Sequence, residues 1–115
     1  MISLEIFFLA FLCIQLIHSI EELTTGFHRN FPLFKMPMWV FVVFEILFQG
    51  FFWLVFLNES CAGRDVLAHV FALLMFANGL WHMVWWGVVK KYVSGLITAP
   101  ILVVTFIVFY FSMLT

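Results

Sequence analysis

Apolar residues along this chain fall into four long runs, and polar residues gather between them. Each run approaches the roughly 20 residues that an α-helix needs to cross the hydrocarbon core of a bilayer. The runs cover residues 2–23, 37–57, 67–89 and 97–114. The pattern therefore predicts an all-α, polytopic integral membrane four-helix bundle in which residues 1–115 form a single domain.

The composition also favours a membrane-embedded chain. Hydrophobic residues make up 66% of the sequence and charged residues only 10%, whereas soluble domains carry about 25% charged residues. Because charged residues are too few to form a water-facing surface over the apolar residues, most side chains are expected to be surrounded by the lipid bilayer. The five Lys and Arg residues are scattered and the formal net charge is -1, which argues against nucleic acid as a partner.

The positions of the positive charges predict how the helices are oriented. Arg29, Lys35, Lys90 and Lys91 lie in the first and third connections, whereas Arg64 alone lies in the second. Because connections rich in Lys and Arg stay on the cytoplasmic side, both termini are expected outside the cytoplasm.

Three of the four runs contain polar or ionisable residues at positions that the bilayer would surround. They are Gln15, His18, Glu21 and Glu22 in the first run, Glu45 and Gln49 in the second, and Asn78 and His82 in the third. An ionisable side chain at the bilayer centre costs about 2.5–3.5 kcal/mol, so each of these groups needs a polar partner or water.

The spacing of these residues places them on one stripe of each helix and at one depth. At about 100° per residue, His18, Glu21 and Glu22 share one face of the first helix. The polar pairs of the second and third helices are each four residues apart, so each pair also shares a face. At about 1.5 Å per residue, Glu45 and His82 each lie roughly 12 Å from the same membrane side. We therefore expect one shared intramembrane site, and the alternative is a structural network that holds the helices together.

The first candidate function is an isomerase-like enzyme that moves protons on a lipid-like or isoprenoid substrate. Buried carboxyl and imidazole groups packed together can exchange a proton near neutral pH. Glu45 would donate or accept the proton, with Glu22 and His18 as its relay. The further candidate catalytic residues are Glu21, Asn78 and His82, and the candidate substrate-binding residues are Gln15, Gln49, Trp81 and Trp85. The two Trp rings lie on the stripe of His82 and would stabilise a carbocation through their π faces.

Two other functions fit the same residues. His and Glu side chains from packed helices are ligands for zinc, iron or manganese, so a hydrolytic or redox metal site is the second candidate. Its expected ligands are His18, Glu22, Glu45 and His82. The third candidate is transport of a proton, ion or small solute by a homo-oligomer, because intramembrane Glu and His chains also mark proton pathways.

A few polar residues outside these stripes are expected at the membrane interfaces. Glu5 and His69 point away from the polar stripes and lie near the outer ends of their helices. His28 lies beside Arg29 at the basic surface, where water or lipid head groups would satisfy it, and Tyr92 is expected to anchor the chain at the interface.

Three short motifs resemble the bacterial membrane protein family that is named for its HXXEE motif. They are His18-x-x-Glu21-Glu22, Asn78-x-x-x-His82 and Tyr92-Val93-Ser94-Gly95. The family pattern has Pro at the position of Ser94, so the third motif is only partly met. The resemblance covers most of the chain and implies a place in the bacterial cytoplasmic membrane. It implies which positions matter, and it implies no reaction.

A weaker similarity links the chain to the four-helix sterol isomerase and emopamil-binding group. The segment Asn78-Gly79-Leu80-Trp81 is similar to an Asn-x-x-Trp motif of that group. His18 with Glu22 on the first helix and Glu45 on the second follow the same order. This similarity implies acid/base chemistry on a sterol-like substrate.

Overall fold

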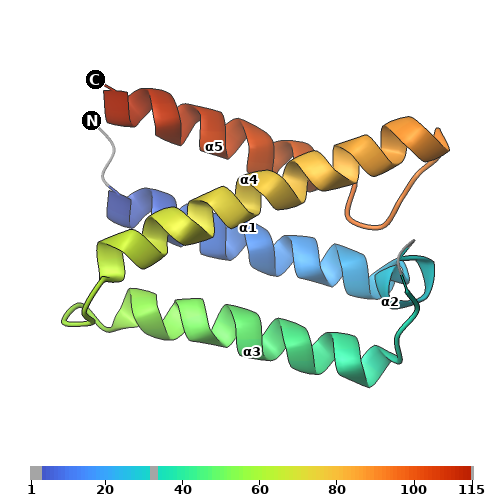
Figure 1. The fold of residues 1–115 in the computed structure, drawn as a ribbon, viewed down its shortest axis with the longest axis horizontal. Coiled ribbons are helices and arrows are strands. Elements are labelled where there is room, and N and C mark those ends of the chain that lie inside the picture. Colours follow the sequence, from blue (N-terminus) through green and yellow to red (C-terminus); the bar gives the residue numbers. More distant parts are fainter. Residues whose placement is uncertain (1–3, 32–33, 115) are drawn as a thin grey trace.

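A computed structural model of the protein describes residues 4–31 and 34–114. These residues form five α-helices and no strand (Figure 1). The helices are α1 (Leu4–Thr24), α2 (Phe27–Asn30), α3 (Met38–Leu57), α4 (Arg64–Val89) and α5 (Ala99–Leu114). The all-α prediction is confirmed, but the predicted helix count of four misses α2, which lies inside the first connection. A single turn in a Phe-rich segment leaves no periodic pattern from which sequence alone would detect it.

Three helices of the described residues, α1, α3 and α4, are long and apolar enough to cross a membrane. They indicate an integral membrane protein. Helix α5 is apolar but has only 16 residues, fewer than the roughly 20 that span the hydrocarbon core. Large apolar side chains face outward, as on α3, where Leu47 and Leu54 are 68% and 69% exposed. Such a surface suits contact with lipid tails rather than water.

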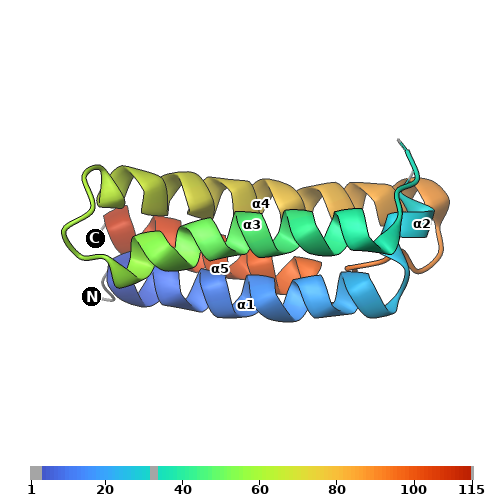
Figure 2. The same ribbon diagram turned by 90° about the horizontal axis from the view of Figure 1, so that it is seen from below.

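Helix α1 contacts each of the other four helices. Helices α3 and α4 pack together on one side of it, and α4 also packs along α5 (Figures 1 and 2). The α4–α5 contact is tight at Gly79, where an added Cβ would lie 2.7 Å from the carbonyl oxygen of Ala99. A side chain at this position would therefore push α5 away from α4.

One half of the bundle is filled by a cluster of buried apolar side chains. This cluster includes Phe7, Phe8, Phe11 and Leu12 of α1, Phe52 and Val55 of α3, Phe71, Ala72 and Met75 of α4, and Leu102 and Phe109 of α5. At the end of this half, Arg64 pairs with Glu5 and donates to the carbonyl oxygens of Val55 and Phe56 at 3.1 and 2.7 Å. Glu5 thus lies at the end of α1, as the sequence predicts, and its partner is Arg64 of α4. The polar stripes occupy the other half of the bundle.

Candidate functional site

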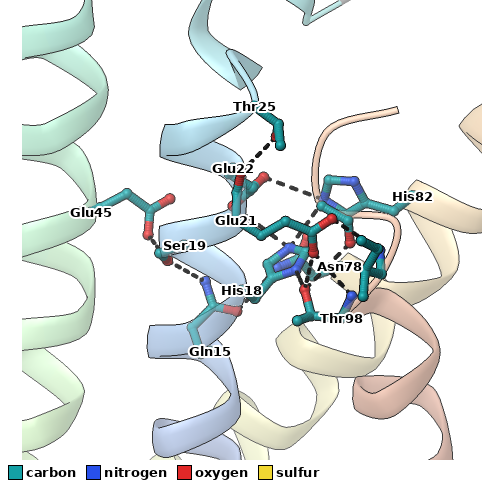
Figure 3. A network of polar contacts seen from close by, with 12 residues as sticks. Gln15, His18, Ser19, Glu21, Glu22, Thr25, Glu45, Asn78, His82 and Thr98 are labelled. Atoms are coloured by element: carbon teal, nitrogen blue, oxygen red, sulfur yellow. Dashed lines mark hydrogen bonds and ion pairs between the residues drawn. The ribbon is translucent and has the colours of Figure 1, made fainter. Parts of the chain in front are cut away.

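Two buried histidines form the centre of the polar half. His18 on α1 and His82 on α4 are both fully buried, and their Nε2 atoms lie 3.2 Å apart. Glu22, one turn after His18, completes a triangle with Oε2 at 3.3 Å from His82 Nε2 and Oε1 at 3.6 Å from His18 Nε2. The three side chains point toward one another in Figure 3. The structure thus brings the His18-x-x-Glu21-Glu22 motif on α1 against the Asn78-x-x-x-His82 motif on α4.

Glu21 has a different surrounding from the adjacent Glu22. Its carboxylate accepts hydrogen bonds from the backbone N–H groups of Ile97 and Thr98, both at 3.0 Å, just before α5 begins. It also accepts one from the Thr98 hydroxyl at 2.7 Å and one from the Tyr92 hydroxyl. Glu21 therefore holds the start of α5 against α1, because a carboxylate satisfies the free N–H groups at a helix N-terminus.

The Thr98 hydroxyl fixes which nitrogen of His18 carries the proton. Thr98 has one hydroxyl proton, and the ionised Glu21 carboxylate beside it can only accept. Thr98 Oγ1 must therefore donate to Glu21 and accept from Nδ1–H of His18, from which it lies 2.5 Å. Nε2 of His18 is then unprotonated and can only accept a hydrogen bond, as from His82 Nε2 at 3.2 Å. Sequence reasoning missed Thr98, because Thr98 lies 80 residues after His18 in the chain and only the folded loop brings the two together.

Gly95 closes the site from the loop between α4 and α5. Its φ of +91° is unfavourable for residues with a Cβ. A Cβ at this position would lie 2.7 Å from Cε1 of His18 and 2.7 Å from Cε1 of His82. The neighbouring Ser94 donates to the carbonyl oxygen of Thr25 at 3.0 Å, so the loop is tied to the end of α1. The third motif therefore covers the two histidines supplied by the other motifs.

A second set of hydrogen bonds runs across α1 from α4 to α3. Asn78 donates to Gln15 at 3.3 Å, and Gln15 donates to Ser19 at 3.3 Å. Ser19 donates to Glu45 Oε2 at 2.7 Å, and Gln49 donates to both Ser19 and Glu45 at 2.6 and 3.1 Å. Ser19, which sequence reasoning passed over, is the link between the helices. Its position inside the His18-x-x-Glu21 motif was the signal available.

Glu45 is not one of the residues that converge with the histidines. Among the His, Cys, Asp and Glu side chains of the described residues, three lie close enough together to hold one ion. They are His18, Glu22 and His82. The predicted four-ligand set therefore reduces to three. The predicted relay also differs, because Glu45 is held by Ser19 and Gln49 and the hydroxyl of Thr98 bonds to His18.

An apolar cavity of about 440 Å³ borders both sets of polar residues. Its wall is mostly aromatic and aliphatic, and the polar residues on it are Gln15, Glu22, Glu45 and Asn78. Phe34 and Phe44 also line it and are 57% and 59% exposed, so the cavity opens on the outer surface of the bundle. Glu45 and Gln49 border a second cavity of about 240 Å³.

The two Trp residues lie beside the larger cavity and are not among its lining residues. Trp81 and Trp85 stack on each other with ring centroids 5.4 Å apart. Trp81 packs against Phe31 and Trp85 against Phe27, and these two Phe rings do line the cavity. In this conformation the Trp rings support the wall, and the Phe rings present their surfaces to the cavity.

The residues that the sequence assigned to the interface have mixed outcomes. His69 is exposed and its Nδ1 lies 2.8 Å from the carbonyl oxygen of Asp65. The prediction for His28 is wrong, because it is buried against Phe41, and its Nδ1 has no hydrogen-bond partner among the described residues. Tyr92 lies in the connection between α4 and α5 and bonds to Glu21, and partial burial and this bond raise its pKa above the usual value. Tyr92 therefore remains a hydrogen-bond donor at neutral pH.

These features define an all-helical membrane protein with a buried His–Glu cluster beside an apolar cavity. The chain belongs to the family described as proteins of unknown function with an HXXEE motif, whose sequence profile matches residues 9–110. The resemblance inferred from the three motifs is thereby confirmed. Neither the curated proteins nor the solved structures include a match to this chain.

Proposed function

We propose that this protein is a membrane-embedded enzyme that performs isomerase-like acid/base chemistry on a lipid-like or isoprenoid substrate. The observation that carries the proposal is the presence of two carboxylates, Glu22 and Glu45, on the wall of one apolar cavity. Apolar cavities with a few convergent polar groups are the usual form of small-molecule sites. In this proposal α5 is the fourth membrane span, the chain lies in a bacterial cytoplasmic membrane, and both termini lie outside.

The shape and lining of the cavity support an apolar substrate. Its volume of about 440 Å³ falls within the range of about 300–1,000 Å³ that is typical of ligand sites. The exposed rings of Phe34 and Phe44 mark the side on which a molecule would enter directly from the lipid. A polar substrate would lose its hydration on this path without regaining hydrogen bonds from the wall, which disfavours it.

Glu45 is the proposed proton-transferring group. It is half-buried, borders both cavities, and is oriented by hydrogen bonds from Ser19 and Gln49. Movement of a carbon–carbon double bond adds a proton at one carbon and removes a proton from another, so it needs no further reactant. The amide side chains of Gln15 and Asn78 would orient a hydroxyl or other polar end of the substrate from the same wall.

Solvent deuterium provides the test of this proposal. Purified protein incubated with a total lipid extract of its host membrane in D₂O should introduce deuterium into a specific apolar lipid. Glu45→Gln keeps the shape of the side chain but cannot carry the proton, so it should abolish incorporation. Asp65→Asn, a change at an exposed carboxylate on α4, is the matched control and should retain it. Incorporation by Glu45→Gln at the wild-type rate would contradict the role of Glu45. Absence of incorporation by the folded wild-type protein would contradict the proposed reaction.

The alternative of transport gains no specific support from the described residues. The apolar half of the bundle is packed with Phe, Leu and Met side chains, so the polar residues do not continue along the bundle. Transport by a homo-oligomer stays a prediction from the sequence.

A further inference from the structure

We infer that His18, His82 and Glu22 bind one divalent metal ion, with zinc as the preferred ion. This inference uses atoms other than those of Glu45. It therefore goes beyond the proposed proton transfer, although it shares Glu22 with the proposed site, and zinc binding is measured separately from deuterium incorporation.

Two of the three distances within the triangle are near those of a tetrahedral metal site. Ligand atoms about 2.0–2.1 Å from a tetrahedral zinc ion lie about 3.3 Å apart. The separation of the two Nε2 atoms is 3.2 Å, and Glu22 Oε2 lies 3.3 Å from His82 Nε2. Octahedral ligands at about 2.1 Å would approach each other to about 3.0 Å. Two of the three observed edges are therefore near the tetrahedral value, and the third, from Glu22 Oε1 to His18 Nε2, is longer at 3.6 Å.

The protonation pattern of His18 suits a metal ligand. A ligating imidazole needs a free lone pair, and its other nitrogen usually donates a hydrogen bond that fixes the ring. Nδ1 of His18 donates to Thr98, which in turn donates to Glu21. This arrangement leaves Nε2 unprotonated and directed into the triangle. Gly95 lets the loop approach both rings closely enough for Thr98 to make this contact.

The charge of Glu22 also calls for a cation. Its side chain is 5% exposed, and within the part of the chain that the structure describes no Lys or Arg pairs with it. Its nearest partners are the two imidazoles, and a buried carboxylate is costly in a low-dielectric surrounding unless a cation or a hydrogen-bond donor satisfies it. Two neutral imidazoles and one carboxylate are a ligand set of catalytic zinc sites, which keep a fourth position open. Glu22 also lines the apolar cavity, so the proposed ion would lie next to it.

Metal binding can be measured on the full chain in detergent. The protein is stripped with a chelator, titrated with Zn²⁺, and titrated separately with Co²⁺, whose tetrahedral complexes absorb strongly in visible light. Wild-type protein should bind about one equivalent of zinc and show the tetrahedral cobalt spectrum. Mn²⁺ and Fe²⁺ are the competing ions and should bind more weakly.

Three variants and one control assign the binding to the triangle. His18→Ala, His82→Ala and Glu22→Gln should each weaken zinc binding at least tenfold, because each removes one of three ligands. His69→Ala removes an exposed histidine from the same helix as His82 and should bind zinc like the wild type. Circular dichroism and gel filtration identify variants that fail to fold, and the wild-type cobalt spectrum decides the geometry independently of all variants.

Three results would overturn the metal site. They are less than about one-tenth of an equivalent of zinc on folded wild-type protein, equal loss of binding in His69→Ala, and a cobalt spectrum without tetrahedral character. If zinc binding fails by these criteria, deuterium incorporation that is lost in Glu45→Gln would still support the proposed proton transfer. Zinc binding without any deuterium incorporation would support the metal site while the proposed proton transfer fails.

Discussion

Replacement of Gly95 by Ala tests whether the loop before α5 really covers the histidine pair. The added Cβ would lie 2.7 Å from a carbon of each imidazole and 3.0 Å from Nδ1 of His82, at a φ of +91°. Forced overpacking costs about 1–3 kcal/mol, and an unfavourable backbone conformation about 1–3 kcal/mol more. We expect Gly95→Ala to lower the free energy of unfolding by about 2–6 kcal/mol.

The assay is unfolding in mixed detergent micelles, followed by circular dichroism, with Gly50→Ala as the control. Gly50 lies within α3, and an added Cβ there meets no atom within 4 Å. Alanine at a helix interior is favoured over glycine by about 0.5–1 kcal/mol, so the control should be as stable as the wild type or more stable. If Gly95→Ala unfolded at the wild-type midpoint, the close packing of the loop on the two rings would be refuted.

Three further predictions concern the proton-transferring residue, the support of His18 and the orientation in the membrane. Glu45→Gln should leave the free energy of unfolding nearly unchanged in the same assay. Glu45→Leu should lower it by about 1–3 kcal/mol, because it leaves buried polar partners unsatisfied. Equal stability of the two variants would count against the hydrogen bonds that Ser19 and Gln49 donate to Glu45. Thr98→Val should weaken zinc binding about 10- to 100-fold in the titration, since it removes the hydrogen bond that orients the ligand, and Thr105→Val, at a threonine that bonds within α5, should not. Cysteines placed near Asn58 should react with an impermeant reagent in intact cells, and those near Lys90 only after permeabilisation; labelling of the Lys90 connection in intact cells would reverse the orientation.

The helices of this protein follow largely from its apolar runs. The predicted run 37–57 corresponds to α3 at Met38–Leu57, and the run 67–89 ends where α4 ends. Helix α4 begins at Arg64, three residues earlier than predicted, because Arg64 is polar yet bonds back to the end of α3. Such a contact depends on the folded arrangement and leaves no signal in hydropathy.

The candidate site was accessible from sequence only where helical periodicity applies. Four-residue spacing placed His18 with Glu22 and Asn78 with His82, and depth placed the two helices in register. The roles of Glu21 and Thr98 were beyond this reasoning, because they arise in a loop that returns to α1 from 77 positions away. Helical geometry likewise predicts that Glu45 shares a face with Gln49, but not that Ser19 of α1 would be its hydrogen-bond partner.

The central claim is that a lipid-like molecule occupies the cavity beside Glu22 and Glu45, and site-resolved photolabelling tests it most directly. A diazirine-bearing isoprenoid alcohol is irradiated with the purified protein, and the labelled residues are mapped by mass spectrometry. Phe41 and Met75 line the cavity and are only 3% and 2% exposed, so a probe has to enter the cavity to label them. We expect saturable labelling of these two residues that unlabelled isoprenoid alcohol competes away. Labelling confined to outward-facing residues such as Leu47 and Leu54, without saturation, would contradict the claim.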